Sequence, residues 1–417
     1  MKNLQPFVLC IAIILACSCK NKKETSAPML NDTANENTVI VELPVIDLQK
    51  EYPKKKVCIQ DYADIEYIPL ETHDNALITS KHLSGMKWVD DMLAVSDFDA
   101  IHFFNRQGKY LSSINKRGGS GEEYNFISSY TIDPKAKEVY IYDFKVLNNK
   151  LLVYDIDGTF KRRIPLKDYT NNQPIFDYSP QELITCDIFN LDKIDEKDPT
   201  SKQPYYKISK HDGTVSLLPI VLEDRFGDAL RFHKNDLSHT IKIGIYPFVK
   251  NGDELIIADF AMDTVYTYKD DQLKPIAVRK NRYKENGNPI LATLLLKTNR
   301  YQFWDVCEKK IEFDGQKASV PDPQRLLFDR FTGECFYFDE FDNADGIPAD
   351  SAMEMRFSQK LGLKSTEVAP NCITQAFEAE FLINQYNNGK LSGPLKDIAS
   401  NLQIDDNPVL MIARFRE

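Results

Sequence analysis

The amino-acid sequence predicts an all-β protein folded as a six-bladed β-propeller. Two kinds of segment recur in the same order, as expected when each blade is a four-stranded antiparallel sheet. The first kind is an apolar strand that ends in an acidic corner, and it occurs at Leu93–Asp99, Val139–Lys145, Leu183–Phe189, Leu255–Ala261 and Cys335–Phe341. The second kind is a hairpin, and it occurs at Phe103–Ile114, Val153–Ile164, Ile208–Ile220 and Val265–Ile276.

The turns of these hairpins support the prediction. Gln-Gly or Asp-Gly stands between β-rich runs at Gly108, Gly158 and Gly213, and this is a strong hairpin signal. Together the two segments give a unit of four strands, and about five such units lie between Ser84 and Asp342. A β-sandwich would also contain many short strands, but it would not repeat them in this order.

Strands from the two ends of the chain are expected to complete the ring. The segment "DIEYIPLET" (Asp64–Thr72) is a strand without a blade of its own, and "NPVLMIARF" (Asn407–Phe415) is a clear final strand. Pairing these strands in one mixed blade would leave no exposed sheet edge. The sequence therefore predicts a sixth blade in which the N- and C-terminal strands close the ring.

A few helical insertions are expected in the later part of the chain. The segment Asn288–Val306 has a helical pattern of apolar residues and is expected to decorate the ring. Thr374–Lys390 and Gly393–Leu402 have helical spacing too, and glycine or proline marks their ends.

The N-terminus has the features of an export signal. Lys2 precedes the apolar run Pro6–Ala16, which is too short to span a bilayer comfortably. This run ends at Cys17 in a pattern that resembles a bacterial lipobox, with Cys19 as the second choice for acylation and an ordinary secretory signal as the alternative. We expect a signal peptide at residues 1–16, a flexible polar tether at 17–40 and the propeller at 41–417.

The overall charge argues against a nucleic-acid partner. The chain has 417 residues and a formal net charge of −10, whereas phosphate binding needs a clustered basic excess. No Cys-x-x-Cys spacing is present, and the six histidines show no ligand spacing. The sequence therefore predicts neither a metal site nor a cofactor.

Several of these segments resemble a known family. "DIEYIPLET", "FFNRQGKYLSSI", "KRGGSGEEY", "TIDPKAKEVYIYD", "LLVYDIDGTF" and "DDNPVLMIARF" are similar to segments of the six-bladed β-propeller lipoproteins of Gram-negative gut anaerobes, distant relatives of the NHL-repeat propellers. The resemblance covers nearly the whole mature chain. It implies a six-bladed ring and a lipid anchor in the outer membrane, and it supplies no catalytic residues.

The chain departs from this family at one loop and after the lipobox. Family members commonly have Gly-Pro-Gly before a Glu-Tyr pair, whereas here Ser120-Gly121-Glu122 precede Glu123-Tyr124. The stretch after Cys17 is rich in lysine, with Glu24 as its acid, whereas surface-exported members carry several acids there. Both the periplasmic and the cell-surface side of the outer membrane therefore stay open.

The glycine-rich segment Ser113–Phe126 is the first candidate site. It lacks the third glycine of a dinucleotide fingerprint and the Gly-Lys-Ser/Thr of a Walker loop, and a strand follows it. In a propeller this segment would cross from the outermost strand of one blade to the innermost strand of the next, where glycine tolerates positive φ. A ligand role would fall to Arg117, Glu123 and Tyr124, which offer charge, an acceptor and a stacking ring.

The acids at the strand ends form a second candidate site. Connections from second to third strands share a face of the ring with the blade crossovers, so we expect these acids beside the glycine-rich segment. Each carboxylate could accept amide hydrogen bonds within its own turn, or together they could form an acidic rim for a cation or a polyhydroxylated ligand. The acids are Asp97, Asp143, Asp187, Asp259 and Asp339.

Two functions of different classes remain. The preferred hypothesis is a lipid-anchored, non-catalytic binding or scaffold module for a glycan, a peptide or a neighbouring envelope protein. The alternative is a carbohydrate-active hydrolase or lyase with two carboxylates facing one another across the channel. Trp88 and Trp304 could stack on sugars, although tryptophan in a β-rich chain more often packs in the core.

Overall fold

The structure is a computed structural model. It describes residues 43–78, 85–97, 99–143, 150–166, 172–187, 197, 201–225, 227–234, 237–244, 246–315, 317–339, 341–347 and 371–417. All of these residues belong to one compact unit, Val39–Glu417. The expected signal peptide (1–16), the tether (17–40) and the acylation candidates Cys17 and Cys19 lie outside the described residues.

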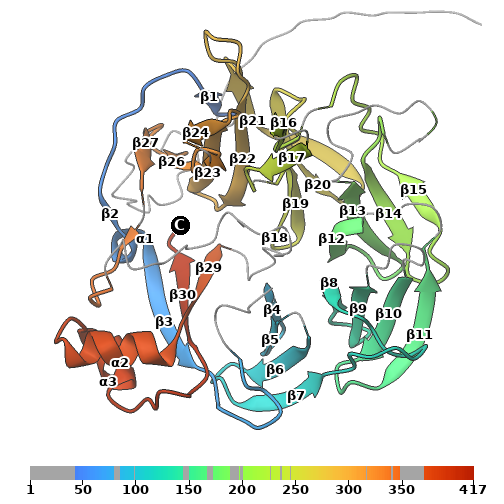
Figure 1. The fold of residues 1–417 in the computed structure, drawn as a ribbon, viewed down its shortest axis with the longest axis vertical. Coiled ribbons are helices and arrows are strands. Elements are labelled where there is room, and N and C mark those ends of the chain that lie inside the picture. Colours follow the sequence, from blue (N-terminus) through green and yellow to red (C-terminus); the bar gives the residue numbers. More distant parts are fainter. Residues whose placement is uncertain are drawn as a thin grey trace, which may run out of the picture. The chain divides into compact units, whose positions relative to one another are not determined.

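Sheets of antiparallel strands follow one another around a ring, which confirms the six-bladed β-propeller (Figure 1). The first three blades have the strand orders β4-β5-β6-β7, β8-β9-β10-β11 and β12-β13-β14-β15. Their strands are β4 (Gly85–Val89), β5 (Met92–Ser96), β6 (Ile101–Asn105), β7 (Tyr110–Ile114), β8 (Ile127–Asp133), β9 (Glu138–Asp143), β10 (Lys150–Asp155), β11 (Phe160–Pro165), β12 (Asn172–Asp177), β13 (Glu182–Asp187), β14 (Tyr205–Ser209) and β15 (Val215–Leu217).

The next two blades have the orders β18-β19-β20-β21 and β22-β23-β26-β27, and β1 (Val45–Asp47) adds in parallel to the edge of β21. Their strands are β18 (Phe248–Asn251), β19 (Glu254–Ile257), β20 (Thr264–Lys269), β21 (Gln272–Lys280), β22 (Ile290–Lys297), β23 (Tyr301–Glu308), β26 (Gln324–Asp329) and β27 (Cys335–Phe338). Three strand pairs of the described residues form sheets of their own and are described below.

The sixth blade confirms the expected ring closure. Its described strands have the order β29-β30-β3, in which the C-terminal β30 (Val409–Phe415) lies between β29 (Cys372–Phe377) and the N-terminal β3 (Ala63–Pro69). The antiparallel register of β3 and β30 runs from Ala63 opposite Phe415 to Pro69 opposite Val409. A short pair of β2 (Val57–Cys58) with β28 (Phe341–Asp342) links the entering chain to the fifth blade.

Six apolar clusters hold the ring together, one at each contact between neighbouring blades. The cluster between the first and second blades contains Phe103 and Ile141, for example, and the cluster between the second and third blades contains Tyr142 and Leu183. The cluster that joins Ile412 of the sixth blade to Phe104 of the first closes the circle. Side chains on both surfaces of every blade are therefore buried, and burial of this apolar area drives the blades together.

One expected helix is wrong. Asn288–Val306 forms β22 and most of β23, which pair with each other from Ile290 opposite Glu308 onward. Residues of β22 are buried at nearly every position because a blade covers each side of the strand. An apolar run buried on both sides has no period of two, so its pattern cannot be distinguished from that of a buried helix.

The helices near the C-terminus are confirmed in part. Thr374–Lys390 begins as strand β29, and only its second half forms a helix, α2 (Ala379–Asn387). The expected helix at Gly393–Leu402 is α3 (Gly393–Ala399), and a single short turn, α1 (Ile59–Tyr62), precedes β3. None of the helices in the described ranges has the length and apolarity needed to cross a bilayer.

The two tryptophans lie mainly within the packed ring. Trp304 is fully buried in the cluster between the fourth and fifth blades. Trp88 packs against the cluster between the sixth and first blades, and the Arg106 guanidinium lies 5.7 Å from the centre of its ring. Packing thus accounts for both side chains.

Candidate functional site

The glycine-rich segment connects β7, the outermost strand of the first blade, to β8, the innermost strand of the second. This confirms the predicted crossover. The loop is closed by backbone hydrogen bonds from Gly118 N to Tyr124 O (2.9 Å) and from Tyr124 N to Lys116 O (3.1 Å). The Glu123 carboxylate accepts a hydrogen bond from Ser120 N at 2.7 Å, which fixes the corner.

The glycines of this loop are needed for a reason other than the expected positive φ. Gly118, Gly119 and Gly121 are not among the residues with positive φ. A Cβ atom on Gly118 would lie 2.2 Å from a carboxylate oxygen of Glu123, and one on Gly121 would lie 2.5 Å from Arg163 Nη2. The glycines at these two positions therefore leave room for charged side chains.

Tyr124 is a core residue. Its side chain is fully buried, and its hydroxyl lies 2.7 Å from the carbonyl oxygen of Asp99 and 3.0 Å from that of Ile114. The same hydroxyl accepts a hydrogen bond from Lys116 N at 3.0 Å, and burial raises the pKa of the phenol. The ring therefore offers no face to a ligand, and Tyr124 supports the loop from below.

Arg117 and Glu123 lie at the surface. The Arg117 guanidinium pairs with the Asp99 carboxylate, and both side chains are more than half exposed. Hydrogen bonds from the Ser120 amide hold the pKa of Glu123 below its usual range. Glu123 lines the groove described next, whereas Arg117 and Tyr124 do not.

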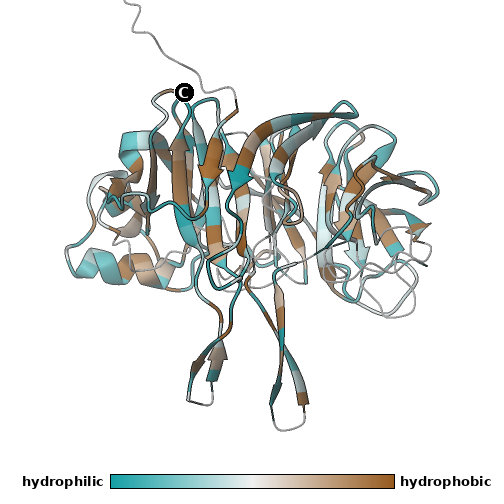
Figure 2. Cartoon of the chain, turned by 90° about the horizontal axis from the view of Figure 1, so that it is seen from above, coloured by the Kyte–Doolittle hydropathy of each residue, from teal (hydrophilic) through white to brown (hydrophobic). Residues whose placement is uncertain are grey.

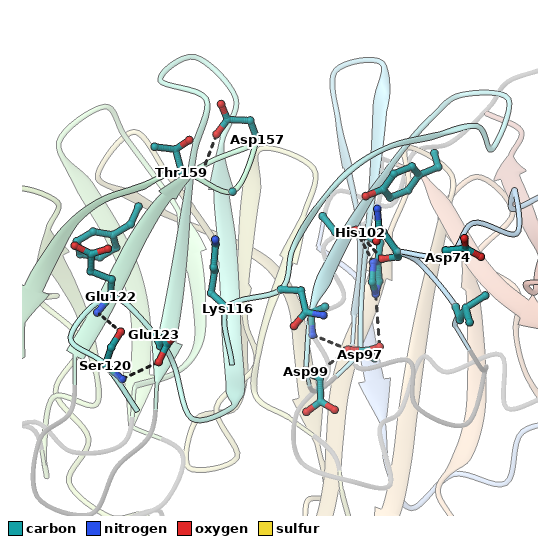
Figure 3. Close-up of a pocket in the computed structure, with 18 residues that line it drawn as sticks. Asp74, Asp97, Asp99, His102, Lys116, Ser120, Glu122, Glu123, Asp157 and Thr159 are labelled. Atoms are coloured by element: carbon teal, nitrogen blue, oxygen red, sulfur yellow. Dashed lines mark hydrogen bonds and ion pairs between the residues drawn. The ribbon is translucent and has the colours of Figure 1, made fainter. Parts of the chain in front are cut away.

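An open groove of about 950 Å³ runs beside β7 (Figure 3). Four stretches of the chain meet there: the segment before the first blade, β5 to β7, the crossover to the second blade, and the turn between β10 and β11. Among the lining residues, Lys116 is the one lysine and there is no arginine. The carboxylates are those of Asp74, Asp97, Asp99, Glu122, Glu123 and Asp157.

A chain of contacts among Asp97, His102 and Ser113 forms part of the groove wall (Figure 3). His102 Nδ1 lies 2.8 Å from Ser113 Oγ, and His102 Nε2 lies 3.6 Å from an Asp97 carboxylate oxygen. The other oxygen of Asp97 accepts hydrogen bonds from the Asp99 and Ala100 amides. Burial raises the pKa of Asp97, but the bonds from His102 and these amides outweigh it and leave the pKa lowered.

Aromatic side chains complete the lining. Tyr110 and Phe160 both face the groove, and the Tyr110 ring stacks on His73 with centroids 4.1 Å apart and planes inclined by 16°. The site therefore combines hydrogen-bond acceptors with flat apolar surfaces, as small-molecule sites commonly do.

The strand-end acids do not form one rim: Asp97 and Asp259 accept bonds within their own turns, whereas Asp143 bonds to the preceding crossover. Asp143 accepts a hydrogen bond from Asn125 N (3.0 Å), and Asp259 accepts bonds from Ala261 N (2.9 Å) and from the Tyr205 hydroxyl (2.7 Å). Asp187 is also buried. Of the five predicted acids, Asp97 alone lines the groove.

Asp339 departs from the expected pattern. It follows β27, the outermost strand of the fifth blade, rather than a second strand. Its carboxylate is largely exposed and pairs with Lys54 Nζ at 2.7 Å. The segment "CFYFDEF" resembles the other strands with an acidic end in composition, but it forms the fourth strand of its blade. The second strand of this blade is β23, which lies in the segment expected to be a helix.

Sequence reasoning missed two buried arginines that bond to the connections after second strands. Arg279 donates to the carbonyl oxygens of Ala258 (3.0 Å) and Asp259 (2.5 Å), and Arg225 donates to that of Asp187 (2.9 Å). The Tyr124 hydroxyl bonds to a connection of the same kind at Asp99. No sequence signal marks the arginines, because Arg279 lies in β21 whereas Arg225 lies between β15 and β18.

A solved structure with a TM-score above 0.5 supports the fold. A protein from Bacteroides fragilis, provisionally described as exported, is 14% identical with a TM-score of 0.57, and the match covers 89% of this chain and 100% of that one. A member of the DUF4221 family from Bacteroides vulgatus is 10% identical with a TM-score of 0.48, covering 86% and 99% of the two chains. No curated protein matches this chain. A family model described as "Domain of unknown function (DUF4934)" matches residues 43–414, and the chain belongs to that family.

Proposed function

We propose that this protein is a lipid-anchored β-propeller of the outer membrane that binds a ligand, without converting it, in the groove beside β7. The observation that carries the proposal is the groove itself, with a volume of about 950 Å³ and a lining rich in carboxylates. Such a lining favours ligands that donate hydrogen bonds or carry positive charge.

A polyhydroxylated glycan, neutral or amino-substituted, fits this chemistry best. Its hydroxyl or ammonium groups would donate to Asp74, Glu122 and Asp157, whose side chains are exposed. Its apolar ring faces would lie against Tyr110 and Phe160.

The residues first predicted for ligand binding divide between three roles in this proposal. Glu123 would accept a hydrogen bond from the ligand at the crossover end of the groove. Arg117 would position Asp99 by pairing with its carboxylate, and Tyr124 would support the loop from the core.

Binding is favoured over hydrolysis because of the protonation of the carboxylates. A general acid needs a raised pKa so that it carries a proton near neutral pH. The pKa values of Asp97, Glu123 and Asp157 are all lowered; for Glu123 and Asp157 the main causes are the amides of Ser120 and Thr159. The alternative, a carbohydrate-active hydrolase or lyase, would require a groove carboxylate with a raised pKa, and the pKa values of these three are shifted the other way.

The anchor part of the proposal rests on the N-terminal sequence. Acylation at Cys17, or at Cys19, would tether the propeller on the periplasmic or the cell-surface side of the outer membrane. Metabolic labelling of the full chain with radioactive palmitate tests this. We expect label in the wild type and none in a Cys17→Ala/Cys19→Ala variant, and the two single variants show which cysteine carries it. Label that survives substitution of both cysteines would contradict the anchor.

A glycan array tests the ligand class. The unit Val39–Glu417, which contains all six blades, should bind a defined set of glycans, and a Glu122→Gln/Asp157→Asn variant should lose that binding. A Glu51→Gln/Glu285→Gln variant removes two exposed acids outside the groove lining and should bind like the wild type. An array without any binding would contradict the proposal, and release of a shorter glycan would favour the hydrolase.

A further inference from the structure

Two β-hairpins project from the same side of the ring (Figure 2). One consists of β16 (Ala229–Lys234) and β17 (Leu237–Lys242) and is inserted between the third and fourth blades. The other consists of β24 (Glu312–Asp314) and β25 (Lys317–Ser319) and lies between the second and third strands of the fifth blade. Each is a two-stranded sheet that pairs with no blade.

The longer hairpin has two different faces. Its register places Arg231 opposite Thr240 and His233 opposite Ser238 on one face, to which Lys242 also belongs. The other face carries Lys234 next to the tip and otherwise mainly apolar and aromatic side chains: Leu230, Phe232, Leu237, His239 and Ile241. The strands β16 and β17 carry Arg231, Lys234 and Lys242 and no acid, although the whole chain has a net charge of −10. The shorter hairpin carries Glu312 and Asp314 on either side of Phe313, and Lys317 on the second strand, so the basic charge belongs to the longer hairpin.

Aromatic rings join the two hairpins. The ring of Phe232 stacks on His239 with centroids 5.1 Å apart and meets the edge of Phe313 at 5.7 Å. At the base, Leu230 and Val320 pack on a small buried cluster that includes Phe260 and Leu291 of the fourth and fifth blades. An isolated two-stranded hairpin is only marginally stable, so these contacts hold the projections in place.

Large apolar side chains are exposed on the hairpins despite these contacts. Leu237, directly after the tip of the longer hairpin, is 63% exposed, and Phe313 is 61% exposed. Exposed apolar groups close to a basic surface mark an interaction site rather than a solvent-facing one. The hairpins are separate from the acidic groove, since none of their residues lines it.

We propose that the two hairpins dock this face of the propeller onto an anionic phospholipid surface. Leu237 and Phe313 would enter the headgroup region, while Arg231 and Lys234 of the longer hairpin would lie against lipid phosphates. The basic residues are concentrated on the longer hairpin, where Lys234 lies opposite Leu237 next to the tip, so they can reach the lipid while the acidic body stays further away. A membrane is favoured over a protein partner because insertion needs only a few side chains on narrow tips, whereas a stable protein interface buries a broad area.

Flotation with lipid vesicles tests this proposal on Val39–Glu417, which lacks the cysteines expected to be acylated. We expect the unit to float with phosphatidylglycerol–phosphatidylethanolamine vesicles at low salt, to be released by salt, and to ignore phosphatidylcholine vesicles. A Leu237→Ser/Phe313→Ser variant should bind at least about tenfold more weakly. An Arg231→Gln/Lys234→Gln variant should lose roughly fivefold per charge.

Matched controls separate docking from general surface effects. Leu111→Ser removes an exposed apolar side chain from β7, and Lys135→Gln/Lys274→Gln removes two exposed cations outside the hairpins. Both should float like the wild type. Circular dichroism would establish that each variant folds, and the charge variant provides the test if the apolar one does not.

Three outcomes would overturn the proposal. The wild-type unit could remain unbound at low salt, which would point to a protein partner for the hairpins. It could bind zwitterionic vesicles equally well. The hairpin variants could also float as the wild type does, which would assign the binding to another surface. Because the groove takes no part, none of these outcomes bears on glycan binding.

Discussion

At the scale of single residues, hydroxyl and guanidinium groups satisfy the backbone of the connections that follow second strands. Buried carbonyl groups in these connections would cost free energy if they had no partner. Tyr124 bonds to the carbonyl of Asp99, and Arg225 and Arg279 bond to those of Asp187 and Asp259. Different side chains thus solve the same problem in different blades.

We predict that Tyr124→Phe lowers the free energy of unfolding by about 1–3 kcal/mol, because it leaves buried backbone groups without a partner. Urea denaturation of Val39–Glu417 measures the change. Tyr283→Phe removes a hydroxyl from a ring that is 46% exposed and serves as the control, with little expected effect. Equal stabilities of the two variants would show that the Tyr124 hydroxyl does not support the crossover.

A charged network on the second blade makes stability depend on pH. Glu138 accepts bonds from Arg162 Nη1 (2.6 Å) and Nη2 (2.8 Å) and from the Tyr140 hydroxyl (2.6 Å). The bidentate Arg162 contact is the main reason that the pKa of Glu138 falls from 4.5 to about 2. Because the folded state holds the carboxylate ionised, its contribution is complete above about pH 4.5 and is lost as the pH falls toward 2.

We predict that Glu138→Gln removes this dependence. Between pH 6 and pH 2.5 the wild type should lose roughly 2 kcal/mol more stability than the variant, after allowance for the solvent-exposed side of Arg162. Chemical denaturation of both proteins at several pH values gives the difference between their free energies of unfolding. The other acids titrate alike in the two proteins, so their contributions cancel in this difference. Parallel stability profiles for the two proteins would contradict the network.

At the scale of elements, the turns between third and fourth strands lie close to the previous blade in the first three blades. Gly213, with φ of 76°, lies so close to the end of β11 that a Cβ atom would be 2.2 Å from Pro165 O. Gly108 approaches Pro69 O of the sixth blade in the same way, at 2.1 Å. Gly333 occupies the same turn in the fifth blade with φ of 73°, but a Cβ atom there would meet nothing within 4 Å.

This difference gives a matched pair of variants. Gly333→Ala should cost about 1 kcal/mol, which reflects positive φ alone. Gly213→Ala should cost about 3 kcal/mol or more, because the added methyl group also forces the turn away from β11. Thermal or urea denaturation compares the two, and equal losses would mean that the turn does not brace the neighbouring blade.

The sequence identified the elements whose pattern is local. Glycine hairpins and strands with an acidic end were recognisable because their turn residues have fixed positions, as at Gly158 and Asp97. The strands β22 and β23 were mistaken for a helix because burial on both sides removes the alternation of a strand. The helix expected at Thr374–Lys390 is wrong in its first part for a related reason, because β29 lies within the sixth blade and continues directly into α2.

At the scale of the whole molecule, ring closure was predictable but the groove was not. Repeat order and two unmatched end strands were sufficient to predict the β3–β30 pairing. The groove, by contrast, gathers Asp74, Asp97 and Asp157 from stretches that lie in different parts of the repeat. Glu123 was found because it adjoins the glycines, whereas the other lining residues depend on how the first two blades pack.

The central claim, that the acidic groove binds the ligand, is tested most directly by isothermal titration calorimetry. The titrant is the tightest glycan from the array, and the proteins are wild-type Val39–Glu417, Glu122→Gln/Asp157→Asn and the control Glu51→Gln/Glu285→Gln. Each lost hydrogen bond to a carboxylate is worth about 1.5–3 kcal/mol, so the groove variant should bind at least about tenfold more weakly while the control is unchanged. An unchanged dissociation constant for the groove variant would contradict the claim.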